Sequence, residues 1–185
     1  MNYPLRISLC GFGGQGIILA AVVLGTAAVT RSGKYAVQTQ SYGSEARGGQ
    51  CQAELIIDDK PITSPIANKK NLLVCLFQEA YAKYIDTLED DGVLVIDPRL
   101  VTRLTRDIPR TFKVPATEIA LSLGNKMAAN IVTLGFLSEC CGLLNREDLK
   151  AVVAESVPER FVGLNLAAMD AGARYARNRG LYATE

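Results

Sequence analysis

The stretch Gly11–Gly16, written GFGGQG, constrains this chain more than any other part of its sequence. A short apolar run from Leu5 to Cys10 precedes the glycines, and a long apolar run from Ile17 to Val29 follows them. This order predicts a strand, a glycine turn and the start of a helix, with the spacing G-x-G-x-x-G. The helix N-terminus would suit a phosphate, a carboxylate or a closely approaching backbone. The motif alone does not distinguish a cofactor site from a partner contact or from tight packing.

Length and charge exclude several classes of protein. The chain has 185 residues, which suits one domain spanning residues 1–185, and its net charge is +1. That charge gives no electrostatic basis for binding nucleic acid or an anionic membrane. The apolar run from Ile17 to Val29 is too short to span a bilayer, and the N-terminus lacks the pattern of a signal peptide. We therefore expect a cytoplasmic protein with no nucleic-acid and no membrane partner.

The residues that usually carry self-sufficient catalysis are missing or scattered. The sequence has no histidine, which removes the commonest metal ligand and the commonest general base. No two cysteines form C-x-x-C, so zinc-ribbon and ferredoxin-type spacings are absent. We expect free buried thiols, no metal site and no cofactor bound by this chain alone. The five cysteines are Cys10, Cys51, Cys75, Cys140 and Cys141.

Apolar periodicity predicts an α/β fold: a three-layer α/β/α sandwich with a mostly parallel or mixed sheet, a Rossmann-like first βα unit and a helical C-terminal part. The helix expected near residues 15–31 has no polar face, so it is either buried or covered by another subunit. Strands are expected at 4–10, 35–40, 51–57, 71–77, 93–98 and 111–114. Further helices are expected at 78–85, 115–123 and 126–141, after Asn145, and at 163–179.

A second glycine-rich stretch, residues 41–50, lies between two predicted strands. It carries Tyr42, Glu45 and Arg47 together with Gly43, Gly48 and Gly49. A solvated hairpin connection is the plain interpretation, but functional loops on rigid scaffolds are common. Because both glycine loops follow early strands, we expect them to meet at one edge of the sheet.

The dinucleotide interpretation fails on its most discriminating residue. A nicotinamide site needs an acid about twenty residues after the glycines, at the end of the second strand. The corresponding region is Lys34-Tyr35-Ala36, and the first acid after Gly16 is Glu45. We expect instead that Gln15 aims its side-chain amide at whatever lies in the cleft. Asn125 and Asn130 lie off the apolar stripe of their helix and are weaker candidates for the same cleft.

Two motifs together resemble the gamma subunit of 2-oxoacid:ferredoxin oxidoreductases. They are the Gly11–Gly16 turn and the stretch Val37–Gly49, written VQTQSYGSEARGG. The stretch Pro115–Ala120, with Gly124-Asn125 and Ala129-Asn130, is also similar, so the resemblance covers about residues 4–155. The sequence of Val37–Gly49 is more similar to the 2-oxoglutarate-type branch than to pyruvate-type chains. Ser44 departs from the family, where proline is expected, and leaves the loop less stiff.

The resemblance implies one subunit of a larger enzyme. Such complexes decarboxylate a 2-oxoacid oxidatively with coenzyme A and release an acyl-CoA, CO2 and reduced ferredoxin. Thiamine diphosphate, Mg²⁺ and the [4Fe-4S] clusters would lie on other subunits, and the partners would be the alpha, beta and ferredoxin-like delta subunits. The isolated chain is a candidate for homodimerisation.

Under this interpretation the chain has no catalytic residue of its own and forms part of the wall of the active-site or coenzyme A cleft. A stand-alone nucleotide- or acyl-CoA-binding module and a purely structural interface protein are the alternatives. The expected contact residues are Gly13, Gly14, Gln15, Gly16, Tyr42, Glu45, Arg47, Gly48, Gly49, Asn125 and Asn130.

Overall fold

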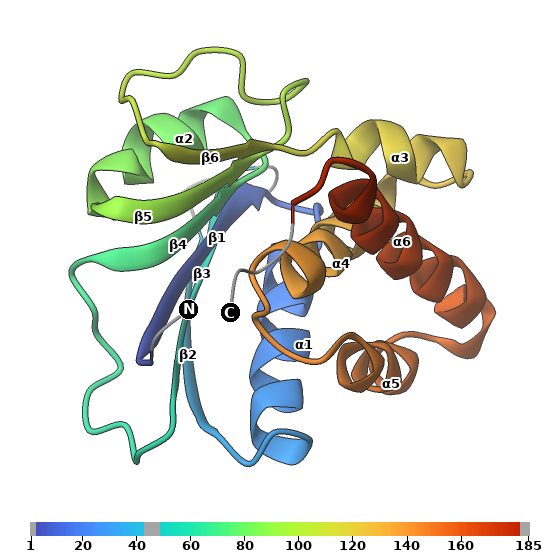
Figure 1. Cartoon of the computed structure of the whole chain (residues 1–185), viewed down its shortest axis with the longest axis horizontal. Coiled ribbons are helices and arrows are strands. Elements are labelled where there is room, and N and C mark those ends of the chain that lie inside the picture. Colours follow the sequence, from blue (N-terminus) through green and yellow to red (C-terminus); the bar gives the residue numbers. More distant parts are fainter. Residues whose placement is uncertain (1–2, 43–48, 182–185) are drawn as a thin grey trace.

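The computed structural model describes residues 3–42 and 49–181. Within these residues, six strands form one mixed sheet in the order β2-β3-β1-β4-β5-β6 (Figure 1). The expected α/β class and the Rossmann-like first βα unit are confirmed. The strands are β1 (Leu5–Phe12), β2 (Tyr35–Tyr42), β3 (Gln50–Asp58), β4 (Lys70–Cys75), β5 (Leu88–Ile96) and β6 (Arg110–Lys113).

The direction of the strands decides which loops meet. β1, β4, β5 and β6 run parallel, and β3 runs antiparallel to both β1 and β2. β2 therefore runs in the direction of β1, although β3 separates the two. In consequence the C-terminal ends of β1 and β2 lie at the same edge of the sheet, where β3 begins.

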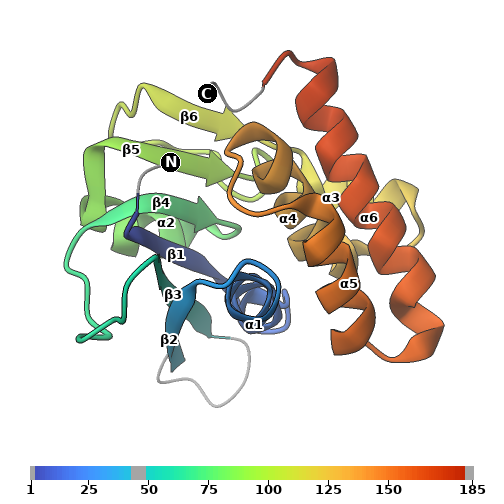
Figure 2. The same cartoon turned by 60° about the horizontal axis from the view of Figure 1, so that its bottom comes forward.

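Helices cover the two faces unequally. Figures 1 and 2 show α1, α4, α5 and α6 on one face of the sheet and α2 on the other. None of the helices built by the described residues is long and apolar enough to cross a lipid bilayer. The helices are α1 (Ile17–Thr30), α2 (Gln78–Tyr84), η1 (Ile85–Thr87), α3 (Ala116–Ser122), η2 (Lys126–Ala128), α4 (Ala129–Cys140), α5 (Arg146–Ser156) and α6 (Glu159–Asn178).

Two apolar cores form, one on each face. The larger core joins α1 and the C-terminal helices to the sheet, and the smaller core joins α2 to β4, β5 and the segment 97–108. β4 and β5 contribute to both cores, which explains why their sequences read as continuous apolar runs. The helix–sheet–helix layering follows from this burial on both faces.

Some boundaries differ from the sequence prediction. β5 begins at Leu88, in a stretch expected to be a charged connection, because Leu88 is buried and pairs with Lys70 of β4, with a register shift before Val93. Glu89 in this stretch forms an ion pair with Arg6 of β1 at 2.6 Å. The first three residues of the helix expected at 126–141 form η2, which Asn125 caps, and α4 follows from Ala129. α6 begins at Glu159 rather than near residue 163, with proline before its first residue and an acid in its first turn.

Two glycines allow α4 and α6 to cross with their backbones in contact. A Cβ atom on Gly135 would lie 1.9 Å from the carbonyl oxygen of Met169, and one on Gly172 would lie 1.9 Å from the carbonyl oxygen of Val132. Backbone atoms of a buried helix cannot shift as a flexible side chain can. The spacing of these two helices therefore depends on the absence of both side chains.

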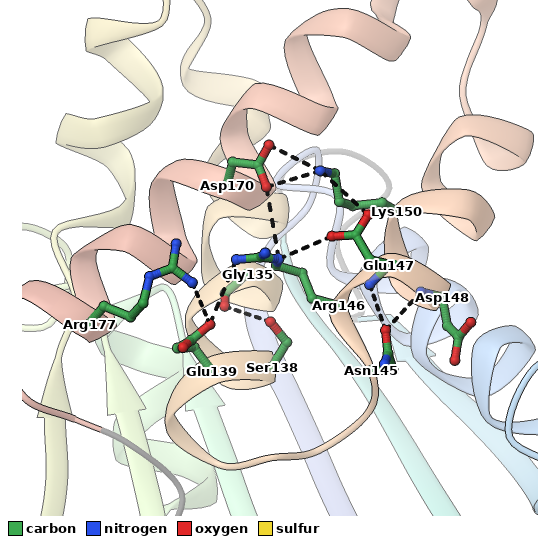
Figure 3. A network of polar contacts seen from close by, with 10 residues as sticks. All are labelled: Gly135, Ser138, Glu139, Asn145, Arg146, Glu147, Asp148, Lys150, Asp170 and Arg177. Atoms are coloured by element: carbon green, nitrogen blue, oxygen red, sulfur yellow. Dashed lines mark hydrogen bonds and ion pairs between the residues drawn. The ribbon is translucent and has the colours of Figure 1, made fainter.

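Charged residues link α5 to α4 and α6 (Figure 3). Arg177 bonds Glu139 at 2.8 Å, Lys150 bonds Asp170 at 3.1 Å, and Arg146 lies between them at 3.7–3.9 Å from both acids. Partly exposed pairs of this kind contribute about 0–1 kcal/mol each. The helix layer is therefore held mainly by its apolar core and by the glycine crossing.

We predict that Gly172→Ala destabilises the chain by about 1–3 kcal/mol or more, because the added methyl group must push α4 away from α6. Gly135→Ala should behave in the same way. The free energy of unfolding in urea measures both effects.

Gly163→Ala is the matched control, since Gly163 lies in the same helix α6 and its Cβ would meet nothing within 4 Å. It should leave stability unchanged or raise it by up to about 1 kcal/mol. Equal stability of the Gly163 and Gly172 variants would show that the crossing is not a constraint.

Candidate functional site

The two glycine loops meet at one edge of the sheet, as the sequence predicted. The N–H of Gly13 donates to the carbonyl oxygen of Gly49 at 2.9 Å. Tyr42 ends β2 opposite Cys51, and its side chain is 63% exposed. The edge formed by residues 12–16, Tyr42 and Gly49 is hereafter called the loop edge.

The backbone of the first loop presents unpaired donors. Gly14 and Gly16 have φ angles of 95° and 71°, in the left-handed region that favours glycine. Among the described residues, neither glycine N–H has a hydrogen-bond partner. Gly16 also immediately precedes α1, whose first-turn N–H groups are free by geometry. Such a run of N–H groups forms a concave site for an anion.

Gln15 does not point into a cleft, in contrast to our expectation. Its Oε1 accepts from the N–H of Phe12 at 2.6 Å, and its Nε2 donates to the carbonyl oxygen of Leu76 at 2.8 Å. Leu76 directly follows β4, so the side chain joins the glycine turn to the neighbouring strand. Gln15 therefore acts in holding the loop and not as a free amide for a ligand.

This bridge closes the crevice in which a dinucleotide would lie. β1 leads to a helix on one face and β4 leads to a helix on the other, which makes the gap between them the usual binding position of such sheets. Phe12 and Phe77 lie at the same gap, with their rings 5.2 Å apart in an edge-to-face arrangement. The bridge and the two rings therefore occupy the gap between the ends of β1 and β4.

Asn130 lies under the loop edge. It is 3% exposed, and its Nδ2 donates to the carbonyl oxygen of Gly16 at 3.0 Å. A Cβ on Gly16 would lie 2.4 Å from that nitrogen, so the glycine is also needed for packing. The Oδ1 of Asn130 is buried and has no partner among the described residues. One acceptor beneath the loop is thus left for a water molecule or a ligand group.

Asn125 has a local role. Its Oδ1 accepts from the N–H of Met127 at 2.9 Å and so caps η2. Glu45, Arg47 and Gly48, which the sequence also placed at the site, lie outside the described residues. The loop edge accordingly brings together Gly13, Gly14, Gly16, Tyr42, Gly49 and the buried Asn130.

Sequence reasoning missed Asp97 at the end of β5. Its carboxylate is fully buried and accepts from the N–H of Arg99 at 3.0 Å and of Thr117 at 2.7 Å. Thr117 lies in the first turn of α3, so Asp97 ties the end of β5 to the start of that helix. An acid directly after a buried apolar strand was the available signal.

The cysteines do not form a metal or cluster site. Cys10, Cys51 and Cys75 lie on three neighbouring strands, while Cys140 and Cys141 lie at the end of α4. All five are free and buried. Within the described residues, no three Cys, Asp or Glu side chains are grouped so that they could hold a metal ion. An iron–sulfur cluster, which needs converging thiolates, does not fit this arrangement.

We predict that Gln15→Ala lowers the stability of the isolated chain by about 1–3 kcal/mol, because it removes two hydrogen bonds to the backbone of Phe12 and Leu76, each contributing about 0.5–1.5 kcal/mol. Gln15→Glu should also destabilise, since a carboxylate cannot donate to the carbonyl oxygen of Leu76. Urea unfolding of each variant without any ligand measures the effect. An unchanged free energy of unfolding would contradict the structural role of Gln15 and would favour a role in ligand binding instead.

We predict that Cys140 is the most reactive of the thiols. A hydrogen bond from Cys141 and the positive charge of Arg110 lower the pKa of Cys140 against the effect of burial, whereas burial raises the pKa of Cys51 and Cys75. More thiolate is then present on Cys140 near neutral pH, and the thiolate is the nucleophile. Limited alkylation at pH 7 followed by peptide mass spectrometry should label Cys140 first.

Arg110→Ala should raise the pKa of Cys140 and slow its labelling at pH 7, with a smaller effect at higher pH. Lys113→Ala, at the other end of β6, is the control. Earlier labelling of Cys75 than of Cys140 would contradict the prediction.

Comparison with known proteins agrees with the resemblance noted in the sequence. The profile of the pyruvate ferredoxin/flavodoxin oxidoreductase family matches residues 6–175. The 2-oxoglutarate synthase subunit KorC of Methanocaldococcus jannaschii is 43% identical, over 93% of this chain and 94% of its own length. The ketoisovalerate oxidoreductase subunit VorA of Methanothermobacter thermautotrophicus is 31% identical over 94% of this chain, which spans only 36% of that relative.

The fold has the same relatives. The crystal structure of the gamma subunit of a keto/oxoacid ferredoxin oxidoreductase from Geobacter sulfurreducens superposes with a TM-score of 0.83 and 39% sequence identity. The match covers 94% of this chain and 99% of that one. Since the family profile, a full-length relative and a solved structure agree, this chain belongs to the pyruvate ferredoxin/flavodoxin oxidoreductase family.

Proposed function

We propose that this chain is the gamma subunit of a 2-oxoglutarate-type 2-oxoacid:ferredoxin oxidoreductase. The complex would oxidise and decarboxylate the 2-oxoacid with coenzyme A, giving an acyl-CoA, CO2 and reduced ferredoxin. The observation that carries this proposal is the 43% identity to a 2-oxoglutarate synthase subunit over nearly the full length of both chains. The chain is not active alone.

The loop edge supports a binding role. It offers backbone N–H groups of Gly14 and Gly16, a helix N-terminus and the exposed hydroxyl of Tyr42. These groups suit a phosphate of coenzyme A or a substrate carboxylate. Arg47, whose planar guanidinium binds such oxygens in pairs, is proposed to complete the site together with Glu45. Within the described part of the edge, the groups offered are backbone N–H groups, one phenol and one buried amide, all of which can bind oxygen atoms of a ligand.

The reaction's cofactors would lie on other subunits. The arrangement of the cysteines does not suit a [4Fe-4S] cluster, so electron transfer to ferredoxin would require a cluster-bearing delta-type subunit. Thiamine diphosphate and its Mg²⁺ would be held by the alpha and beta subunits. We place the whole assembly in the cytoplasm.

A stand-alone nucleotide- or acyl-CoA-binding module is not favoured. The relatives that match nearly the whole chain are subunits of oxidoreductases. The closed gap between β1 and β4 also removes the usual nucleotide position of the sheet.

The proposal is tested by co-expressing the chain with the other subunits of the oxidoreductase from the same organism. We expect co-purification of a brown complex that reduces ferredoxin in the presence of both 2-oxoglutarate and coenzyme A. Omission of this chain should abolish assembly or turnover. A complex that prefers pyruvate would contradict the 2-oxoglutarate assignment, and a complex that is complete and active without the chain would contradict the function.

We predict that Arg47→Ala in the assembled complex raises the KM for coenzyme A or the 2-oxoacid about tenfold, equivalent to roughly 1.4 kcal/mol. Arg103→Ala, an exposed arginine on the segment after β5, is the control. Steady-state kinetics with each substrate varied in turn separates the two ligands. Unchanged constants for Arg47→Ala would remove that residue from the site.

A further inference from the structure

One face of the molecule carries no charge. The sequence has 20 basic and 19 acidic residues, yet none occurs from Ile7 through Thr30 or from Tyr35 through Tyr42. These ranges include all of α1 and all of β2, which lie side by side at one end of the sheet (Figure 2). We call the exposed part of these two elements the α1–β2 face. Charge depletion is the main compositional mark of the core of a protein interface.

The α1–β2 face is also apolar, and it contains a groove. Val22 and Val29 on α1 are 40% and 49% exposed, and Tyr35 at the start of β2 is 48% exposed. A groove of about 310 Å³ runs between the two elements. It is lined chiefly by Val22, Gly25, Thr26, Val29, Ala36 and Gln38. A single large apolar side chain from a partner would fill part of such a groove.

The two outer strands of the sheet differ in how they are protected. β6 has only four residues, and basic side chains stand at both of its ends, Arg110 and Lys113. β2 has eight residues, with no charge and no proline among them. Short, charged outer strands resist pairing with another chain, whereas long uncharged ones invite it. The free backbone of β2 is therefore suited to receive an added strand, and that of β6 is not.

The position of this face indicates what covers it. α1 directly follows Gly16 and β2 ends at Tyr42, so the face is continuous with the loop edge. Under the proposed function, other subunits complete the site at that edge and so reach this side of the molecule. In the relative VorA, a domain like this chain is about a third of a longer polypeptide, so there it is covalently joined to further protein.

We propose that the α1–β2 face is the docking surface for a neighbouring catalytic subunit of the same complex. That subunit contributes an uncharged extended segment that pairs with β2 and places an apolar side chain in the groove. The inference rests on the proposed function, and it adds the surface and the chemistry of the partner segment. A second copy of this chain is the competing occupant that the test must exclude.

Hydrogen exchange of the wild-type protein tests the surface directly. Backbone amides of residues 35–42 should exchange at least tenfold more slowly in the assembled complex than in the isolated chain, while those of β6 should not change. Equal exchange of residues 35–42 in the two states would overturn the added strand.

Charge placed on the face tests the groove. Val22→Glu and Val29→Glu leave a carboxylate in water in the isolated chain, and each should reduce the chain's recovery with its partner subunits at least tenfold. Leu121→Glu on α3 is the matched control, because Leu121 is also 49% exposed on a helix. Equal loss with Leu121→Glu, or normal assembly of the Val29 variant, would overturn the inference.

Light scattering of the isolated wild-type chain separates the two occupants. A monomer is expected, and a dimer that Val29→Glu dissociates would assign the face to a second copy instead. If the wild-type chain binds none of the subunits, the proposed function itself is wrong and this inference fails with it. If the wild-type chain binds and the Val variants bind equally well, only the surface is wrong.

Discussion

The side chain of Gln15 holds together the part of the molecule on which the site depends. One amide group bonds the backbone of Phe12 and Leu76, and so joins β1, the glycine turn and the end of β4. Gly11 must lack a side chain for this, because a Cβ there would lie 2.4 Å from the Gln15 Oε1. The turn thus keeps its N–H groups facing outward while the nucleotide crevice behind it stays closed.

The sequence was informative where local chemistry decides the structure. Apolar runs and glycines predicted the strand–turn–helix start, and the helix expected after Asn145 is α5, which Asn145 caps. The sequence was less informative where a polar side chain has several possible hydrogen-bond partners. The sequence does not indicate that Gln15 donates a hydrogen bond to Leu76, or that Asn130 lies beneath Gly16. Those contacts join residues 61 and 114 positions apart, which only the folded chain defines.

The glycines within helices are a second case in which the sequence pattern alone does not predict the structure. By helix propensity alone, Gly135 and Gly172 destabilise the helices that contain them, so they lower the helix prediction at these positions. In the fold they are what lets α4 and α6 touch. The insertion of β3 between β1 and β2 was equally hidden, because the apolar pattern of a strand does not state its neighbour. The meeting of the two glycine loops could be predicted nonetheless, since it needs only that β1 and β2 share a direction.

The strand order has a consequence for the way the chain folds during synthesis. β1, β2, β3 and β4 all come from the first 75 residues and form one side of the sheet, whereas the helices α4 and α5 that pack against α1 come late in the chain. Domains generally fold as units as the ribosome extends the chain. Since α4 and α5 come late in the chain, the domain cannot cover α1 until both helices have been made. Until then the uncharged helix α1 is exposed to water, and transiently exposed apolar surface of this kind favours aggregation.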